Sequence, residues 1–215
     1  MRTCTKTNSP TLSRGMFIVL SAPAGTGKTT LVKKLVENLP WVVASVSYTT
    51  RHPRSDEIEG VHYHFISRES FEKMIQAGDF LEFVEFCGNY YGTSRKWVEA
   101  MQQEGKHVVL TIDTEGGLSL KDKKDGIYIF VLPPSLKVQR ERLESRGTES
   151  QEDIEKRLAR TPKELRAAIN YDYVIVNEDL EIACSALINI IIAEEHKISR
   201  LLLDASCPKL LIKEE

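Results

Sequence analysis

The sequence contains no apolar run that approaches the ~20 residues needed to cross a bilayer. Its first fourteen residues also lack the apolar core of a secretory signal. The four cysteines are scattered without a CxxC pair, at Cys4, Cys87, Cys184 and Cys207. This spacing argues against a disulfide framework or a zinc site and favours reduced thiols. We therefore expect a cytoplasmic protein with no membrane partner.

An excess of charge of either sign is also missing, because 29 Lys and Arg face 31 Asp and Glu, for a formal net charge of -2. Wrapping of a nucleic-acid polymer depends on many phosphate contacts from basic side chains, so that class of partner is not expected. The chain has 215 residues, of which 41% are hydrophobic. These values predict one globular domain with room for insertions.

Five short apolar runs predict β-strands, at residues 16–21, 41–47, 107–113, 127–132 and 173–177. Their nearly continuous apolar character is typical of strands buried on both faces of a parallel sheet. Helical patterns lie between and after them, at residues 28–38, 95–103, 135–145, 152–169 and 180–203. This alternation predicts an α/β fold with a mostly parallel five-stranded sheet and helices on both faces. Residues 48–93 break the rhythm with closely spaced aromatics, and we expect an insertion of short strands and one helix there.

A glycine-rich loop, APAGTGKT, follows the first predicted strand. Gly25 and Gly27 allow the backbone to direct successive N–H groups towards a phosphate, and the following helix adds its free N–H groups. Lys28 would reach the β- and γ-phosphates, and the Thr29 hydroxyl would ligate Mg²⁺. The pattern GxxxxGK[ST] fails only at its first position, which is Ala22. The alternative is a glycine-rich turn with an incidental Lys-Thr, but the buried strand before it and the amphipathic helix after it favour an ATP site.

The predicted ATP site comprises the whole loop and the residue after it: Ala22, Pro23, Ala24, Gly25, Thr26, Gly27, Lys28, Thr29 and Thr30. An acceptor site needs other residues. Arg51 and Arg54 lie three apart in a turn-rich stretch that also supplies Tyr63. Two guanidinium groups and a phenol suit a monophosphate, because Arg offers forked donors to oxygen pairs. Solvated loop arginines are the alternative for this pair.

Seven stretches now carry a resemblance to a known family, in the order SAPAGTGKTT, SVSYTTRHPR, EGVHYHF, GDFLEF, GNYYGTS, PPS followed by RLESRGTES, and DYVIVNED. The chain resembles the guanylate kinases, which are P-loop nucleoside monophosphate kinases, over nearly its whole globular length. The resemblance implies Mg²⁺-dependent transfer of the ATP γ-phosphate to GMP or dGMP, within purine nucleotide metabolism. It also implies a small GMP-binding subdomain and a helical lid.

The resemblance assigns GMP binding to Ser47, Arg51, Arg54, Tyr63, Glu82, Tyr91, Thr93 and Asp113. It assigns catalysis to Lys28, Arg51, Arg142, Arg146 and Arg157, and places Asn177 near the adenine of ATP. Glu82 would accept hydrogen bonds from guanine N1–H and the 2-amino group. Adenine lacks both donors and would leave the buried carboxylate unpaired, which disfavours it.

The polar residues 1–14 predict a disordered leader and residues 205–215 a tail, and the resemblance implies a kinase domain at 15–204 between them. Within the domain we expect the core at 15–46, 95–140 and 161–204, the GMP-binding subdomain at 47–94 and the lid at 141–160. Gly147 would be the hinge of a lid that closes over ATP and excludes water. Arg140 and Arg160 are interpreted as surface residues.

Two positions depart from the family pattern. An acid is expected two residues before Asp113, where this chain has Thr111, and a glutamine two residues after it, where the chain has Glu115. Metal binding would then rest on Thr29 and the ATP oxygens, with Asp113 or Glu115 as the carboxylate.

Two alternatives remain at this stage. One is a guanylate-kinase-like module that binds peptides, although such modules tend to lose the loop lysine and the lid. The other is a kinase for AMP or UMP, against which Glu82, Ser47 and Thr93 argue.

Overall fold

The computed structural model describes residues 12–54, 57–86, 88–145, 147 and 150–201. Several predictions fall outside these residues: those on Arg146, Cys4, Cys87 and Cys207, on residues 1–11 of the leader and on the tail at 205–215. The fourth cysteine, Cys184, is a buried free thiol. Within the described residues, no helix is long and apolar enough to cross a membrane.

The centre of the fold is a parallel sheet of five strands in the order β2-β7-β1-β8-β9. Its members are β1 (Phe17–Ser21), β2 (Val42–Ala44), β7 (His107–Ile112), β8 (Ile127–Leu132) and β9 (Tyr173–Val176). β1 lies in the middle, with Leu20 beside Thr111 of β7 and Ile129 of β8. The predicted α/β fold is therefore confirmed, although β2 is shorter than the run that predicted it.

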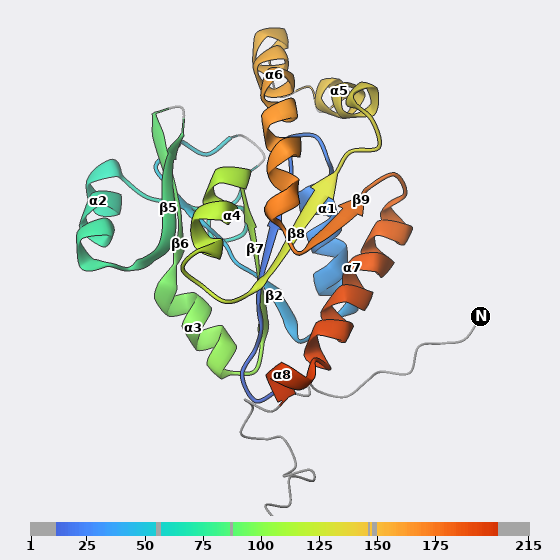
Figure 1. The fold of residues 1–215 in the computed structure, drawn as a ribbon. Helices are drawn as coiled ribbons and strands as arrows, with labels where there is room; N and C mark the ends of the chain where they lie inside the picture. The colour runs from blue at the N-terminus through green and yellow to red at the C-terminus, as the bar shows by residue number, and fades with distance from the viewer. Residues whose placement is uncertain (1–11, 55–56, 87, 146, 148–149, 202–215) are drawn as a thin grey trace, which may run out of the picture.

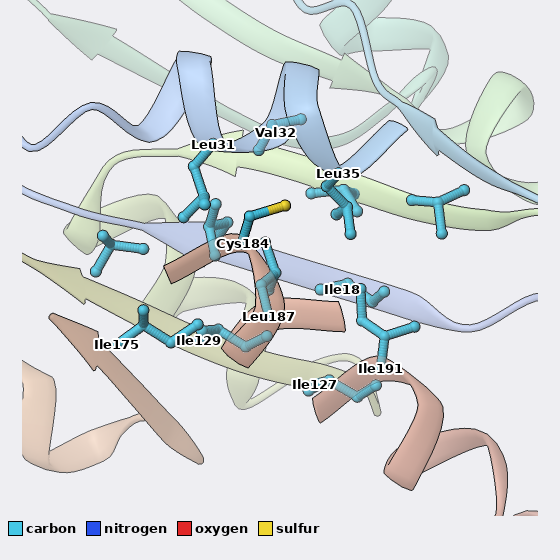
Figure 2. Close-up of a cluster of buried hydrophobic side chains, with 14 of the residues drawn as sticks. Ile18, Leu31, Val32, Leu35, Ile127, Ile129, Ile175, Cys184, Leu187 and Ile191 are labelled. Atoms are coloured by element: carbon cyan, nitrogen blue, oxygen red, sulfur yellow. The ribbon is translucent and has the colours of Figure 1, made fainter. Parts of the chain in front are cut away.

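Helices cover both faces of this sheet (Figure 1). On one face, α1 (Lys28–Asn38) and α7 (Leu180–Glu195) pack against the strands, and Figure 2 shows Leu35 and Leu187 converging on Ile18 and Ile129. All four side chains are fully buried. On the other face, α3 (Arg95–Gln103) and α4 (Thr114–Lys121) cover a second apolar cluster. Because both faces of β1 and β7 are tightly packed, the carboxyl ends of these strands, which border the pocket, are held in place.

Residues 48–94 form the expected insertion of short strands and one helix. The elements are β3 (Tyr48–Thr49), β4 (His64–Phe65), α2 (Arg68–Ala77), β5 (Phe80–Phe86) and β6 (Asn89–Ser94), and the sheet order is β4-β3-β6-β5. Phe71 of α2 is fully buried and stacks on Phe80 at 4.2 Å and on Tyr90 at 5.1 Å between ring centroids. The closely spaced aromatics are thus the core of this second sheet.

The segment between β8 and β9 holds α5 (Leu136–Ser145), α6 (Gln151–Ala167) and a 3-10 turn, η1 (Ala168–Asn170). Figure 1 shows α5 and α6 beyond the carboxyl end of the central sheet. Gly147 lies between them with φ 63°, a left-handed conformation that glycine adopts without strain. The backbone at this position fits the predicted hinge, and its movement stays a prediction.

Three features differ from the sequence-based expectations. α4 was not predicted. The last predicted helix ends at Glu195, and a separate short helix, α8 (Ile198–Leu201), follows. Leu12 is only 6% exposed and belongs to the core under α7, so the packed part of the chain includes residues expected in the leader.

Candidate active site

One pocket, of about 360 Å³, opens where the carboxyl ends of β1 and β7 meet the inserted sheet and α6. In parallel α/β sheets this edge is the usual place for a ligand. Most predicted site residues line the pocket: Ala22, Pro23, Ala24, Gly25, Thr26, Gly27, Lys28, Thr29, Ser47, Arg51, Arg54, Tyr63, Glu82, Tyr91, Asp113 and Arg157. The sequence missed several others, among them Glu57, Thr111, Arg160 and Glu164. Thr30, Thr93, Arg142 and Asn177 are predicted site residues that do not line it.

The phosphate loop needs glycine at two positions. Gly25 has φ 80° and Gly27 has φ 83°, both left-handed. A Cβ on Gly25 would lie 2.9 Å from the Cγ of Leu143, and one on Gly27 would lie 2.7 Å from the Nδ2 of Asn177. The loop is thus tightly packed against Leu143 and Asn177, while its residues and the start of α1 line the pocket. This is a suitable cradle for phosphate oxygens.

Lys28 is the first residue of α1 and lines the pocket. The Nζ donates a hydrogen bond of 2.9 Å to the carbonyl oxygen of Ile112. Burial lowers the pKa of Lys28 to about 8, although Asp113 and Glu164 act in the opposite direction. A phosphate beside it would add negative charge and favour the protonated form.

Side chains behind the loop donate to its carbonyl groups. The Nδ2 of Asn177 lies 2.6 Å from the carbonyl oxygen of Thr26, and the Nη1 of Arg142 lies 3.4 Å from the same atom. The Nε2 of Gln139 lies 2.8 Å from the carbonyl oxygen of Ala24. The structure therefore places Asn177 and Arg142 against the back of the loop, and an adenine contact for Asn177 stays a prediction.

Arg51 lies beside the two tyrosines of the predicted monophosphate cage. Its guanidinium carbon lies 5.5 Å from the centroid of the Tyr63 ring, and the rings of Tyr63 and Tyr91 are 6.0 Å apart. Arg51 also pairs with Glu57 at 2.7 Å, and the other oxygen of Glu57 accepts the backbone N–H of Arg54 at 2.8 Å. The hydrogen bond to Glu57 raises the pKa of Arg51. Glu57 was missed, and its only sequence signal is a position six residues after Arg51 in an acidic run.

Glu82 of β5 faces the pocket from the inserted sheet. Burial raises the pKa of its carboxyl group to about 7, while the hydrogen bond from Thr93 works against the shift and the charge of Asp113 adds to it. The Thr93 hydroxyl lies 2.6 Å from Glu82 Oε1 and is fully buried. Thr93 does not line the pocket, and its hydroxyl orients the Glu82 carboxylate, while its predicted contact with guanine stays a prediction. Ser47 does line the pocket.

Asp113 begins α4, where its Oδ1 accepts the N–H of Gly116 at 2.6 Å. Glu115 points elsewhere: it is 60% exposed and pairs with Lys163 at 2.7 Å. Glu115 is therefore not placed to serve as the metal carboxylate that the sequence suggested. Glu164 of α6 lines the pocket instead, and burial raises the pKa of its carboxyl group.

The described residues contain no group of three or more His, Cys, Asp and Glu that could hold a metal ion alone. The pocket wall nevertheless offers oxygen atoms from Thr29, Asp113 and Glu164. Mg²⁺ takes such hard ligands and commonly completes its shell with water and substrate phosphates. The residues present therefore fit Mg²⁺ bound together with a nucleotide.

From the lid segment, α6 contributes Arg157 and Arg160 to the pocket wall. Arg160 is exposed, as expected of a surface residue, and its side chain also borders the pocket, which was not predicted. The spacing of three residues puts both side chains on one face of the helix, which the sequence could have shown. Arg140 of α5 is a surface residue as expected, since it forms an exposed ion pair with Glu155.

A phosphate loop at the end of a central parallel strand, facing a second basic cage across one pocket, defines an α/β P-loop nucleotide kinase. Comparison with known proteins narrows this class. The family model for guanylate kinase matches residues 14–194. The chain belongs to the guanylate kinase family.

Individual relatives agree with this membership. The chain is 53% identical over 187 residues to the guanylate kinase of Protochlamydia amoebophila, covering 87% of this chain and 95% of the relative. It is 46% identical over 189 residues to the guanylate kinase of Desulfitobacterium hafniense, covering 87% and 94%. The crystal structure of guanylate kinase from Anaplasma phagocytophilum is similar, with a TM-score of 0.71, 36% identity and coverage of 87% of this chain and 90% of that one.

Proposed function

We propose that the protein transfers the γ-phosphate of ATP to GMP or dGMP, giving ADP and GDP or dGDP, with Mg²⁺ and in the cytoplasm. In this role it recycles GMP for purine nucleotide metabolism. The observation that carries the proposal is that one pocket joins the phosphate loop to the cage of Arg51, Arg54, Tyr63 and Tyr91 and to Glu82. A donor site and a monophosphate acceptor site therefore face each other.

On the acceptor side, Arg51 and Arg54 supply forked donors to the GMP phosphate, and Tyr63 and Tyr91 supply phenol hydroxyls. Glu82 accepts from guanine N1–H and the 2-amino group. Thr93 fixes one carboxylate oxygen by its 2.6 Å hydrogen bond, so the base meets an oriented acceptor. An acceptor fixed before binding gains specificity without an added ordering cost. The proposed contacts reach only the phosphate and the base of GMP and not the ribose 2′-hydroxyl, so dGMP is proposed as a second substrate.

On the donor side, the loop N–H groups and Lys28 hold the phosphates of ATP. Phosphoryl transfer depends mainly on positioning and on positive charge around the moving group. Lys28, Arg51 and Arg157 supply that charge from the described pocket, and Arg160 joins them. Arg142 acts through the carbonyl of Thr26, and Arg146 is proposed from the family pattern alone. Mg²⁺, when bound, neutralises phosphate charge, and Thr29 with Asp113 or Glu164 would hold it.

A coupled assay that measures ADP formation tests the proposal. Purified protein is incubated with ATP, Mg²⁺ and one of GMP, dGMP, AMP or UMP. We expect turnover with GMP and dGMP and little with AMP or UMP. Absence of turnover with both guanine nucleotides would refute the proposed function, and preferred turnover of AMP or UMP would refute the assignment of the acceptor.

A further inference from the structure

Gln139 of α5 occupies a junction between the phosphate loop and the lid helix α6. Its side chain is fully buried. The amide Nε2 donates to the carbonyl oxygen of Ala24 at 2.8 Å and to the hydroxyl oxygen of Thr161 at 2.9 Å. An amide nitrogen carries two hydrogens, so both bonds form at once. One side chain thus contacts the loop and α6 together.

The connection continues along α6 to the pocket wall. Thr161 is also fully buried, and its hydroxyl donates to the carbonyl oxygen of Arg157 at 3.4 Å. A hydroxyl group accepts and donates at the same time, so the bonds form a chain from Ala24 through Gln139 and Thr161 to Arg157. Ala24 and Arg157 both line the active-site pocket. The chain therefore links the two walls that would face an ATP phosphate.

The helix is locally weakened at the same point. Pro162 lies inside α6 and has no N–H to donate to the carbonyl oxygen of Leu158. One backbone bond of the helix is thus missing next to Thr161. Side-chain contacts must then contribute more to the placement of Arg157 relative to the loop.

The side-chain oxygen of Gln139 indicates that the amide group acts as a hydrogen-bond donor and does not only fill space. Its Oε1 is buried and has no hydrogen-bond partner among the described residues. An unpaired buried carbonyl oxygen is costly, and an apolar side chain of similar size would avoid that cost. The two donor bonds are what an apolar side chain would lack.

We propose that Gln139 is a positioning residue for phosphoryl transfer, which sets the register of α6, and with it Arg157, against the phosphate loop through Thr161. The inference rests on the proposed function and deepens it. Removing the bridge is expected to lower kcat, because charge around the moving phosphoryl group is misplaced, while the GMP cage on the inserted sheet is untouched.

The test compares Thr161→Val, which removes only the hydroxyl, with Thr161→Ser, which keeps it, and with Gln139→Leu. We expect kcat to fall about 3- to 10-fold in Thr161→Val and in Gln139→Leu, the range of one or two neutral hydrogen bonds. The KM for GMP should change less than about twofold, and Thr161→Ser should restore most of kcat. The kcat of the double variant, Gln139→Leu with Thr161→Val, should equal that of Gln139→Leu alone, because both substitutions break the same bridge.

A matched control is Arg140→Gln. Arg140 joins α5 to α6 through Glu155 as well, but at the surface and without contact to the loop. An exposed pair of this kind contributes little, so kcat should change less than about twofold. The proposal would be overturned if Thr161→Val kept the wild-type kcat, or if Thr161→Ser had a kcat as low as that of Thr161→Val. It would also be overturned if the decreases in kcat of the two single variants multiplied in the double variant.

Hydrogen exchange separates this inference from the proposed function, because it needs no turnover. Exchange of the backbone amides of residues 24–29 should be about 3- to 10-fold faster in Thr161→Val and Gln139→Leu and unchanged in Arg140→Gln. If the wild-type protein fails to phosphorylate GMP, the function is refuted while exchange still tests the bridge. Unchanged exchange in both bridge variants would refute the bridge even in an active enzyme. If Gln139→Leu does not fold, the Thr161 variants decide alone.

Discussion

Substitution of Glu82 by Gln is expected to stabilise the fold and weaken guanine recognition together. Burial raises the pKa of Glu82 from 4.5 to about 7, so keeping the carboxylate ionised in the folded state costs free energy. Each pKa unit is worth about 1.36 kcal/mol, which gives about 3 kcal/mol above pH 7. Glutamine is neutral, and it still accepts the hydrogen bond from Thr93. The variant should therefore avoid the cost without losing that contact.

The pH dependence of this stabilisation follows from the proton that Glu82 binds. Between pH 4.5 and about 7 the folded protein holds a proton on Glu82 that the unfolded chain has released, so wild-type stability from this group falls as pH rises. The advantage of Glu82→Gln should thus be about 3 kcal/mol at pH 8 and about 1 kcal/mol at pH 5.

Urea denaturation of both proteins at pH 8 and pH 5 measures this difference, and at pH 8 the melting temperature should rise by about 6 to 12 °C. Glu85→Gln is the control, because Glu85 lies on the same strand but is 47% exposed in a pair with Arg68. It should change stability by less than about 1 kcal/mol. No stabilisation by Glu82→Gln at pH 8, or the same stabilisation at both pH values, would refute the reasoning.

Three other predictions concern activity. Lys28→Ala should lower kcat by about two orders of magnitude or more in the coupled assay, while calorimetry finds the Kd for GMP within about twofold; a near-normal rate would contradict the role given to this lysine. Arg160→Ala should lower kcat by about 10-fold or more with an unchanged melting temperature, and a rate within twofold of wild type would refute a catalytic role for Arg160. The Kd of the wild-type protein for GMP should rise as pH falls below about 7, because protonated Glu82 no longer accepts two hydrogen bonds. Glu82→Gln should lack this additional pH dependence, although the GMP phosphate titrates in both proteins, and parallel profiles would exclude Glu82 as its source.

The strands and the loop were predictable because their signals are local. A continuous apolar run such as 127–132 reports burial on both faces, and the glycines at 25 and 27 report a left-handed backbone directly. α4 was missed for the opposite reason. Its sequence, TEGGLSLK, contains two glycines and little apolar periodicity. Close packing explains Gly117, since a Cβ there would lie 2.3 Å from the Tyr171 hydroxyl oxygen, and Tyr171 is distant in sequence.

The end of α7 depended on equally distant partners. No glycine or proline occurs between residues 180 and 203, so the helical pattern gave no stop. In the structure, Glu195 is buried at this end and accepts hydrogen bonds from Trp41 at 3.0 Å and from His107 at 2.7 Å. Motif similarity predicted most of the residues that line the pocket, but it did not show that the Thr93 hydroxyl donates to Glu82 or that Glu57 pairs with Arg51. Those facts depend on side-chain packing between segments.

The charges around the pocket have a consequence for the encounter with nucleotides. Among the described lining residues, five cationic side chains (Lys28, Arg51, Arg54, Arg157 and Arg160) stand beside four carboxylic acids (Glu57, Glu82, Asp113 and Glu164). Fields of opposite sign largely cancel over distances beyond about 10 Å at moderate salt. Electrostatic steering therefore adds little to the rate at which nucleotides arrive. Discrimination among the polyanions of a cell then begins only at contact, where the fixed directions of donors and acceptors decide which nucleotide stays.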